Sequence, residues 1–248
     1  HGKPMEQVKV RKMVNVLRTN SAKKVLRVIN DDKLGDDFKI PSKRVLFTGI
    51  SGCIGEAILE KLSQGDWKVA ALHHVESPLE PTVVNFRDDD AIISAIEAIG
   101  GEFDAIILSH GILEPGPWSD TPPAEWRRVM DINLNSIYTI LHSALSRMRE
   151  HGSVVVISST AGYNYSPVGG PHYTAGKWAL NGLVRHLAGE LGPLGIRINA
   201  ICPGLVDSSM GRALLSEKQY LKAFEEIPLR RPAKAEEIAK AVMFLLSA

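Results

Sequence analysis

Short apolar runs alternate with longer amphipathic stretches along most of this 248-residue chain. The short runs are typical of buried parallel strands, and the stretches with apolar positions every three or four residues are typical of helices. The pattern predicts strands at 44–48, 68–73, 82–86, 104–109, 153–158 and 196–201. It predicts helices at 54–64, 88–99, 123–149, 173–191, 211–225 and 235–247. Strands that alternate with helices indicate an α/β fold with a doubly wound parallel sheet.

The N-terminal segment differs from the rest of the chain. Residues 1–30 hold eight lysines and arginines against a single acid, Glu6. We interpret residues 1–40 as a basic, solvated extension, and an arm that packs on a neighbouring subunit or an acidic partner is the alternative. Residues 41–248 are expected to form one domain.

Composition narrows the class of protein. The chain is 44% hydrophobic and 23% charged, which is enough apolar material for one α/β core. The net charge of +1 argues against a nucleic-acid partner, and no apolar run approaches the ~20 residues of a membrane span. No secretory signal pattern opens the chain. Its two cysteines, Cys53 and Cys202, lie in segments that should not pair, so we expect a cytoplasmic protein.

Tyr173 and Lys177 stand four positions apart on a predicted helix, behind an apolar run that ends in Ser158 and Ser159. Positions i and i+4 share one face of a helix, so the ammonium would lie beside the phenol. A nearby cation lowers the pKa of tyrosine from about 10, which makes the phenol a usable general acid/base. Taken alone, the pair also fits a surface helix with a lysine packed along its stem.

A glycine-rich turn follows the first predicted strand. The segment Thr48-Gly-Ile-Ser-Gly-Cys-Ile-Gly55 leads from that strand into an amphipathic helix. Glycines let the backbone approach a pyrophosphate, and a helix N-terminus favours its negative charge. An ordinary glycine-rich turn explains the segment less well, because a strand and a helix flank it.

These motifs, in this order, resemble those of the short-chain dehydrogenase/reductase family. The resemblance covers Lys43 to Ala248 and includes Asp131-Ile-Asn133-Leu, Ile157-Ser-Ser159-Thr-Ala-Gly and Arg197-Ile-Asn-Ala-Ile-Cys-Pro203-Gly204. It implies a Rossmann-type fold, with 41–248 as a dinucleotide-binding catalytic domain. It also implies hydride transfer between nicotinamide and a carbonyl or secondary alcohol, and we expect ketone reduction.

Three expectations concern the architecture. Residues 75–81 are too few for a parallel crossover, so the helix between the second and third strands is expected to be absent. The chain ends at Ala248, before the final strand and glycine-rich tail of the family, so that strand is expected to be missing. Residues 205–227 are expected to form a lid over the substrate.

The resemblance assigns four catalytic roles. Tyr173 transfers the proton of the substrate oxygen, and Lys177 lowers the tyrosine pKa and holds the nicotinamide ribose. Ser159 hydrogen-bonds the developing alkoxide, an oxyanion-type role. Asn133 holds a water that links Lys177 to solvent. Ser158 is the rival of Ser159, and the spacing to Tyr173 favours Ser159.

The resemblance also places a set of residues against the dinucleotide. They come from the glycine-rich turn, the ends of the following strands, the helix of Tyr173 and the turn after the last strand. They are Gly49, Ser51, Cys53, Ile54, Gly55, His73, His74, Asn85, Phe86, Ser109, His110, Gly111, Tyr173, Lys177, Pro203, Gly204, Val206 and Ser208.

Some of these residues depart from the family pattern. Cys53 replaces a glycine; a small residue tolerated in the turn is the favoured interpretation, and a reactive thiol of lowered pKa is the alternative. Asn85 stands where an aspartate is usual. Leu108-Ser109-His110-Gly111 replaces Asn-Asn-Ala-Gly, and His110 fits equally a contact with the nicotinamide ribose and a histidine hydrogen-bonded within its loop.

His73 and His74 bear on the choice of cofactor. A carboxylate at this position would bind the ribose hydroxyls of NAD, whereas a cation would pair with the extra phosphate of NADP. Since no acid stands there and histidine protonates beside a phosphate, NADP(H) is favoured over NAD(H). Two histidines that merely cap the strand are the alternative. No histidine or cysteine pair has the context of a metal site, so no metal is predicted.

The substrate stays open between a small free ketone or alcohol and an acyl group on a carrier protein. The segment after Gly204 resembles that of ketoacyl carrier-protein reductases, and Arg127 and Arg128 could meet an acidic carrier, although solvated arginines are the alternative. The family also implies a homodimer or homotetramer built on helices 123–149 and 173–191. A dinucleotide-binding scaffold that acts through residues 1–40 is the second class of function, disfavoured because all four catalytic residues are present.

Overall fold

The computed structural model describes residues 43–74, 82–209, 212 and 216–247. Its strands form one parallel sheet in the order β3-β2-β1-β4-β5-β6. They are β1 (Lys43–Thr48), β2 (Trp67–His73), β3 (Thr82–Val83), β4 (Phe103–Leu108), β5 (Met148–Ile157) and β6 (Arg197–Ile201). The order reverses between β1 and β4, and a crevice at that point is the ligand site of Rossmann-type sheets. The predicted fold class is confirmed.

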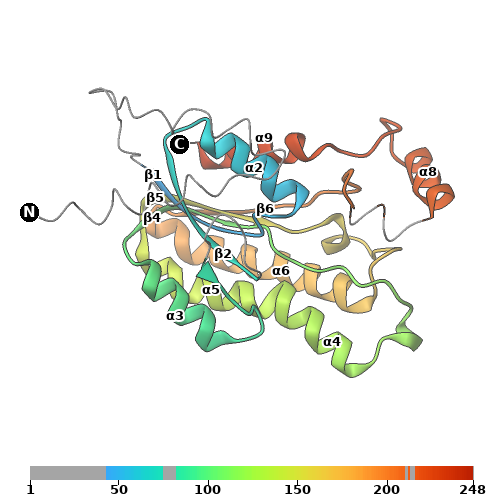
Figure 1. Ribbon diagram of the computed structural model, residues 1–248, viewed down its shortest axis with the longest axis horizontal. Coiled ribbons are helices and arrows are strands. Elements are labelled where there is room, and N and C mark those ends of the chain that lie inside the picture. The colour runs from blue at the N-terminus through green and yellow to red at the C-terminus, as the bar shows by residue number, and fades with distance from the viewer. Residues whose placement is uncertain (1–42, 75–81, 210–211, 213–215, 248) are drawn as a thin grey trace, which may run out of the picture.

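Helices cover both faces of the sheet (Figure 1). On one face α2 (Cys53–Ser63) packs beside α9 (Ala235–Leu246), and on the other lie α3 (Asp89–Ile99), α5 (Ser136–Ala144) and α6 (Pro171–Leu191). α4 (Pro123–Met130) precedes α5, and α8 (Glu217–Glu226) stands apart from the sheet. Short 3₁₀ turns complete the description: η3 (Trp118–Asp120), η5 (Leu145–Arg147), η6 (Thr160–Gly162) and η7 (Gly192–Leu194).

Two apolar cores lie above and below the sheet. Because successive side chains of a strand point to opposite faces, each inner strand feeds both cores. Leu46 and Ile106 join the core under α3, α5 and α6, whereas Val45 and Phe47 join the core under α2 and α9. This burial on both faces explains why the strands are continuous apolar runs in the sequence.

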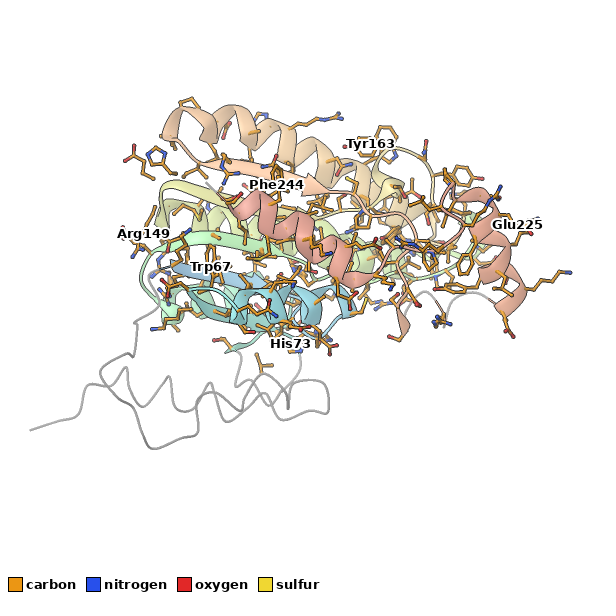
Figure 2. The ribbon with its side chains drawn as sticks, turned by 90° about the horizontal axis from the view of Figure 1, so that it is seen from above. Trp67, His73, Arg149, Tyr163, Glu225 and Phe244 are labelled. Carbon is orange, nitrogen blue, oxygen red and sulfur yellow. The ribbon has the colours of Figure 1, made fainter. Side chains whose placement is uncertain are left out.

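The strand direction places all carboxyl ends on one side of the molecule. Figure 2 shows Trp67 and Arg149, near the amino ends of β2 and β5, on the side opposite to Glu225 of α8. The glycine-rich turn and the residues after β4 and β5 therefore meet at one edge of the sheet.

The predicted helix 123–149 is wrong as one continuous element. α4 passes into a π-helical turn, η4 (Asp131–Asn135), then into α5 and η5, and Met148 already belongs to β5. Arg149 binds the carboxylates of Glu102 and Asp104 at 3.2 and 3.1 Å, and these contacts hold the segment beside β4 as strand. β5 is thus longer than the predicted strand 153–158.

The predicted strand 82–86 is wrong beyond Val83. The chain turns after Val84, because Asn85 accepts hydrogen bonds from Arg87 N through its side chain and from Asp88 N through its backbone. The turn delivers Asp88, whose side chain caps α3 by accepting from Ala91 N. Side-chain hydrogen bonds to the backbone compete in this way with strand pairing.

Several predictions lie wholly or partly outside the described residues. These are the extension 1–40, the short connection 75–81 and part of the predicted helix 211–225. In the described part of that helix, α8 begins at Glu217 behind a capping box formed by Ser216 and Gln219. No helix among the described residues is long and apolar enough to cross a membrane.

Candidate active site

Ser159 and Tyr173 meet at the carboxyl end of β5. Ser159 follows that strand directly, and its Oγ accepts a hydrogen bond from Ala161 N at 3.1 Å. Tyr173 lies in the first turn of α6, which begins at Pro171, where the missing N–H of proline costs the helix nothing. The side chains of Ser159 and Tyr173 are hydrogen-bonded to each other. The strand end and the helix start thus bring two hydroxyls together, as the spacing predicts.

Lys177 lies buried behind Tyr173. Its Nζ donates to Ile157 O at 3.1 Å and lies 5.7 Å from the centroid of the Tyr173 ring. Burial lowers the pKa of Lys177 to about 8. Burial also raises the pKa of Tyr173, and the hydrogen bond from Ser159 opposes that rise. Desolvation of the phenolate dominates in this geometry, so the net pKa of Tyr173 is raised rather than lowered, and the role of Lys177 toward the phenolate stays a prediction.

Asn133 is buried in the π-helical turn and holds the loop that follows β4. Its Nδ2 donates to Ile112 O at 2.7 Å, and its Oδ1 accepts from Ile112 N at 2.8 Å. A Cβ on Gly111 would lie 3.2 Å from Asn133 Oδ1 and 3.9 Å from Lys177 Nζ. Gly111 thus lets the backbone run close to both side chains. The water-binding role of Asn133 stays a prediction.

The glycine-rich turn has the shape needed to receive a pyrophosphate. Gly49 has φ +76°, and a Cβ there would lie 2.5 Å from His110 N. A Cβ on Gly55 would collide with Gly49 O, so both glycines are required by close backbone approach. Gly52, exposed at the N-cap of α2, gives the helix N-terminus no side-chain cap. Unfilled N–H donors at a helix start attract an anionic group, so these residues fit a dinucleotide.

Cys53 is the first residue of α2 and lies against the turn after β6. Its thiol accepts from Ile54 N and is hydrogen-bonded to the Ser208 side chain, yet burial dominates and raises the pKa of Cys53. A raised pKa argues against the reactive-thiol alternative, because a helix N-terminus activates a cysteine only when desolvation does not outweigh it. Pro203 O accepts from Thr160 N at 2.9 Å, which seats the same turn beside Ser159.

His73 and His74 differ in their surroundings. His73 is buried, and its Nδ1 accepts from His74 N at 3.0 Å. Burial lowers the pKa of His73, so its ring is neutral with the proton on Nε2, an atom without a partner among the described residues. His73 therefore offers a donor and no charge. His74 is exposed and is the histidine of the two that remains able to meet a phosphate.

Phe86 and His110 form a buried stack, with ring centroids 4.1 Å apart and planes at 13°. His110 also bonds Thr48 Oγ1 at 2.6 Å and Ser136 Oγ at 2.8 Å. Of the two interpretations of His110, the structure favours a histidine hydrogen-bonded by its surroundings. Thr48 and Ser136 carry no signal in the sequence that would have linked them to His110, because the fold alone brings them together.

Comparison with known proteins places the chain in a family. The family profile described as enoyl-(acyl carrier protein) reductase matches residues 51–248. An acetoacetyl-CoA reductase of Synechocystis sp. is 32% identical over 217 residues, which cover 84% of this chain and 90% of the relative. A crystal structure of a short chain dehydrogenase family protein from Francisella tularensis has TM-score 0.78 and 28% identity, covering 83% of this chain and 91% of that one. The chain belongs to the short-chain dehydrogenase/reductase family.

A second solved structure carries a cofactor. It is a 3-oxoacyl-[acyl-carrier protein] reductase from Brucella melitensis with bound NAD. It has TM-score 0.73 and 28% identity to this short-chain dehydrogenase/reductase, covering 84% of this chain and 85% of that one. Membership of the family makes the protein an NAD(P)-dependent oxidoreductase.

In this short-chain dehydrogenase/reductase, the loop that follows β4 is tied to α4 by ion pairs. Arg128 binds Glu125 at 2.8 Å and Glu114 at 2.5 Å. Glu114 O in turn accepts from Gly170 N at 3.0 Å, and a Cβ on Gly169 would lie 2.8 Å from the Tyr173 ring. The loop after β4 and the approach to α6 thus brace each other beside Tyr173. The described residues contain no cluster of three or more histidine, cysteine, aspartate or glutamate side chains that could hold a metal.

Proposed function

We propose that the protein reduces a ketone to a secondary alcohol, with Tyr173 as the proton donor. The observation that carries the proposal is the Ser159–Tyr173 hydrogen bond in a setting that raises the pKa of the tyrosine. A phenol that keeps its proton at neutral pH is suited to act as an acid, which is the role that carbonyl reduction requires.

The chain's own residues account for the proton side of the reaction. A bound nicotinamide would supply the hydride to the carbonyl carbon. Ser159 donates a hydrogen bond to the substrate oxygen, whose negative charge grows as the C=O bond becomes a C–O single bond. Tyr173 transfers its proton to that oxygen and is left as a phenolate. The buried Lys177 ammonium stabilises the phenolate until solvent returns the proton.

We further propose that NADP(H) is preferred to NAD(H). The support is the exposed His74 and the lack of an acid among the described residues that end β2, His73 and His74, since a carboxylate there would repel a phosphate. His73 no longer contributes a charge to this argument, because it is neutral. The similar Brucella melitensis reductase has NAD bound in its crystal structure. A preference of the present protein for NAD(H) would overturn the proposal.

For the substrate class we propose a 3-oxoacyl thioester. The support is the substrates printed in the names of the Synechocystis sp. and Brucella melitensis relatives. The family profile names an enoyl reductase, and the test below separates the two activities by pairing a ketone with its enoyl counterpart. Of the two arginines proposed for a carrier protein, Arg128 is already held by Glu114 and Glu125, so Arg127 alone is exposed. A homodimer or homotetramer stays part of the proposal.

The test is turnover of acetoacetyl-CoA with NADPH and NADH, with crotonyl-CoA as the enoyl counterpart. We expect oxidation of NADPH by the ketone and not by the enoyl compound. Tyr173→Phe should lose on the order of 10²–10⁴ in rate while its circular dichroism stays unchanged. Near-full activity of Tyr173→Phe would refute the assignment of the acid. Tight cofactor binding without turnover across a broad panel of ketones would favour the scaffold instead.

A further inference from the structure

His110 is a buried side chain with every polar atom engaged. Its Nδ1 lies 2.6 Å from Thr48 Oγ1 and its Nε2 lies 2.8 Å from Ser136 Oγ. The ring is stacked on Phe86. A histidine so fully satisfied in a site is a fixed part of the architecture, because removing one partner of a buried hydrogen bond leaves the other unsatisfied.

The hydrogen bonds also fix which nitrogen of His110 carries the proton. Ser136 Oγ donates its single proton to Ile132 O at 2.8 Å, which leaves Oγ to accept from His110 Nε2–H, and Ile132 O is a further acceptor for the His110 ring. His110 Nδ1 is then an acceptor and takes the proton of Thr48 Oγ1. The resulting chain runs from Thr48 through the imidazole and Ser136 to Ile132 O, with one direction of donation throughout.

The three partners of His110 come from three different segments around the proposed site. Thr48 directly precedes Gly49, whose backbone touches that of His110. Ser136 follows the π-helical turn in which Asn133 holds Ile112. Phe86 belongs to the turn after β3. The imidazole is therefore the common contact of the glycine-rich turn and the turn that carries Asn133.

We propose that His110 is a positioning residue that sets the glycine-rich turn and the Asn133 turn relative to each other, through Thr48 on one side and Ser136 on the other. The proposal rests on the proposed function of the site but assigns His110 no contact with substrate. Each half of the bridge should control one half of the site. The Thr48 bond should govern cofactor affinity, and the Ser136 bond should govern the order of the Asn133–Ile112 pair.

Two variants separate the halves of the bridge. An asparagine amide reaches about as far as histidine Nδ1, and a glutamine amide about as far as Nε2, so His110→Asn keeps a partner for Thr48 and His110→Gln keeps one for Ser136. Cofactor affinity is read by nicotinamide fluorescence, first with NADPH and then with NADH. The order of the Asn133 turn is measured by NMR hydrogen exchange of the Ile112 amide, whose N–H donates to Asn133 Oδ1. Neither readout needs a substrate.

We expect His110→Gln to weaken cofactor binding by about tenfold with little change in Ile112 exchange. We expect His110→Asn to speed Ile112 exchange by about tenfold with cofactor affinity close to that of the wild type. Thr48→Val and Ser136→Ala should reproduce the two patterns, and they serve if a His110 variant does not fold. His186→Asn, on the exposed face of α6, is the control and should change neither.

The proposal is overturned if all four variants change both readouts alike, or if none changes either. Its failure is distinguishable from failure of the proposed function. Loss of the His110 pattern would leave the Tyr173→Phe result untouched, and an absence of ketone turnover would leave both the affinity and the exchange measurements interpretable. As a direct check on the wild type, ¹⁵N NMR should show His110 with its proton on Nε2, and a proton on Nδ1 would also overturn the proposal.

Discussion

Burial disfavours the charged form of both Tyr173 and Lys177. It raises the pKa of the phenol and lowers the pKa of the ammonium, so each group is pushed toward its neutral form. The phenol keeps its proton across the neutral range, whereas Lys177 begins to lose its charge at a pH of about 8. The pair thus works as an acid with a cation behind it only below that pH.

The rate of ketone reduction should follow this titration. We expect kcat/KM to be level below about pH 8 and to fall above it as Lys177 deprotonates, because a neutral amine does not stabilise the phenolate that Tyr173 leaves behind. Initial rates between about pH 6 and about pH 10 measure the profile. Lys177→Arg keeps its charge over this range and should move the fall upward. A rate that rises through this range would contradict the assigned roles.

His110 should leave a signature in acid stability. Burial lowers its pKa from 6.5 to about 3, so below the unfolded value the unfolded chain binds a proton that the folded chain does not. The free energy of unfolding should therefore fall as the pH drops from about 6.5 toward about 3, with a slope of up to about 1.4 kcal/mol per pH unit from this group. Urea unfolding at several pH values measures the slope.

The control separates His110 from the other groups that titrate in acid. His110→Gln should flatten the dependence, whereas His186→Gln should not, since His186 is exposed and its ring is paired with the exposed Glu190 on the same helix. Equal slopes for the wild type and His110→Gln would contradict the buried, neutral state of His110. The charges of Lys177 and His74 also lower the pKa of His110, and both variants retain these two residues.

At the residue scale, the sequence predicted that Ser159 and Tyr173 lie together, but it did not predict their surroundings. Ser159, Tyr173 and Lys177 follow from a strand end and a helical spacing, which are local properties. The pKa of Cys53 and of Tyr173 could not be predicted, because each depends on how much protein covers the group. The contacts of His110 likewise join positions far apart in the chain.

Arginine side chains from other elements hold the last carbonyls of α3. The guanidinium of Arg44, at the start of β1, donates to Gly100 O and to Ile99 O, the latter at 2.9 Å, at the C-terminus of α3. Arg147 donates to Ile96 O in the same last turn at 2.7 Å. These contacts satisfy carbonyls that have no partner within the helix. They lie at the amino edge of the sheet, away from the active site.

Loss of this support should affect stability alone. We expect Arg44→Met to lower the free energy of unfolding by about 1–3 kcal/mol, because it leaves the part-buried carbonyls of Ile99 and Gly100 without this donor. Cofactor affinity should not change. Arg87→Met is the matched control, since among the described residues the Arg87 guanidinium makes a single ion pair, at 3.6 Å with Asp131, and its loss should cost well under that amount. A large loss of cofactor affinity in Arg44→Met would show that the two edges of the sheet are coupled.

Element boundaries show what a hydrophobic pattern omits. Apolar periodicity indicates which face of residues 123–149 is buried. It does not reveal the change of hydrogen-bond pattern by which η4 forms a π helix. α5 ends at Ala144, and the following segment pairs with β4 from Met148 onward, a contact between distant parts of the chain. β3 ends at a turn in which the Asn85 side chain accepts from Arg87 N. Asparagine favours such turns, but the apolar residues around Asn85 led to the prediction of a longer strand.

For the whole molecule, cofactor binding should appear as added stability. A ligand that binds only the folded state at 100 times its Kd adds about 2.7 kcal/mol, which corresponds to roughly 5–10 °C in Tm for a chain of this size. We expect the larger shift from NADPH. His74→Asp should reverse the order by placing a carboxylate where the phosphate would lie. A larger shift from NADH in the wild type would overturn the cofactor proposal.

The fold class was predictable because strands buried on both faces leave continuous apolar runs between helices. The strand order was not readable from periodicity, because pairing joins strands that are distant in the sequence. What places the active site is that order, since β1 and β4 run side by side and turn their chains to opposite faces.

The pairing of β1 with β4 has a consequence for how the chain is made. β1 can pair with β2 soon after both leave the ribosome, but its other edge stays open until β4 has been synthesised, after β2, β3 and α3. During that interval an apolar strand with an unpaired edge is exposed to other nascent chains. We therefore expect a stalled chain that ends before Phe103 to aggregate or bind a chaperone, and one extended past Leu108 to do so less. Limited proteolysis of ribosome-bound chains of the two lengths would show whether the unpaired edge of β1 makes the shorter chain more susceptible.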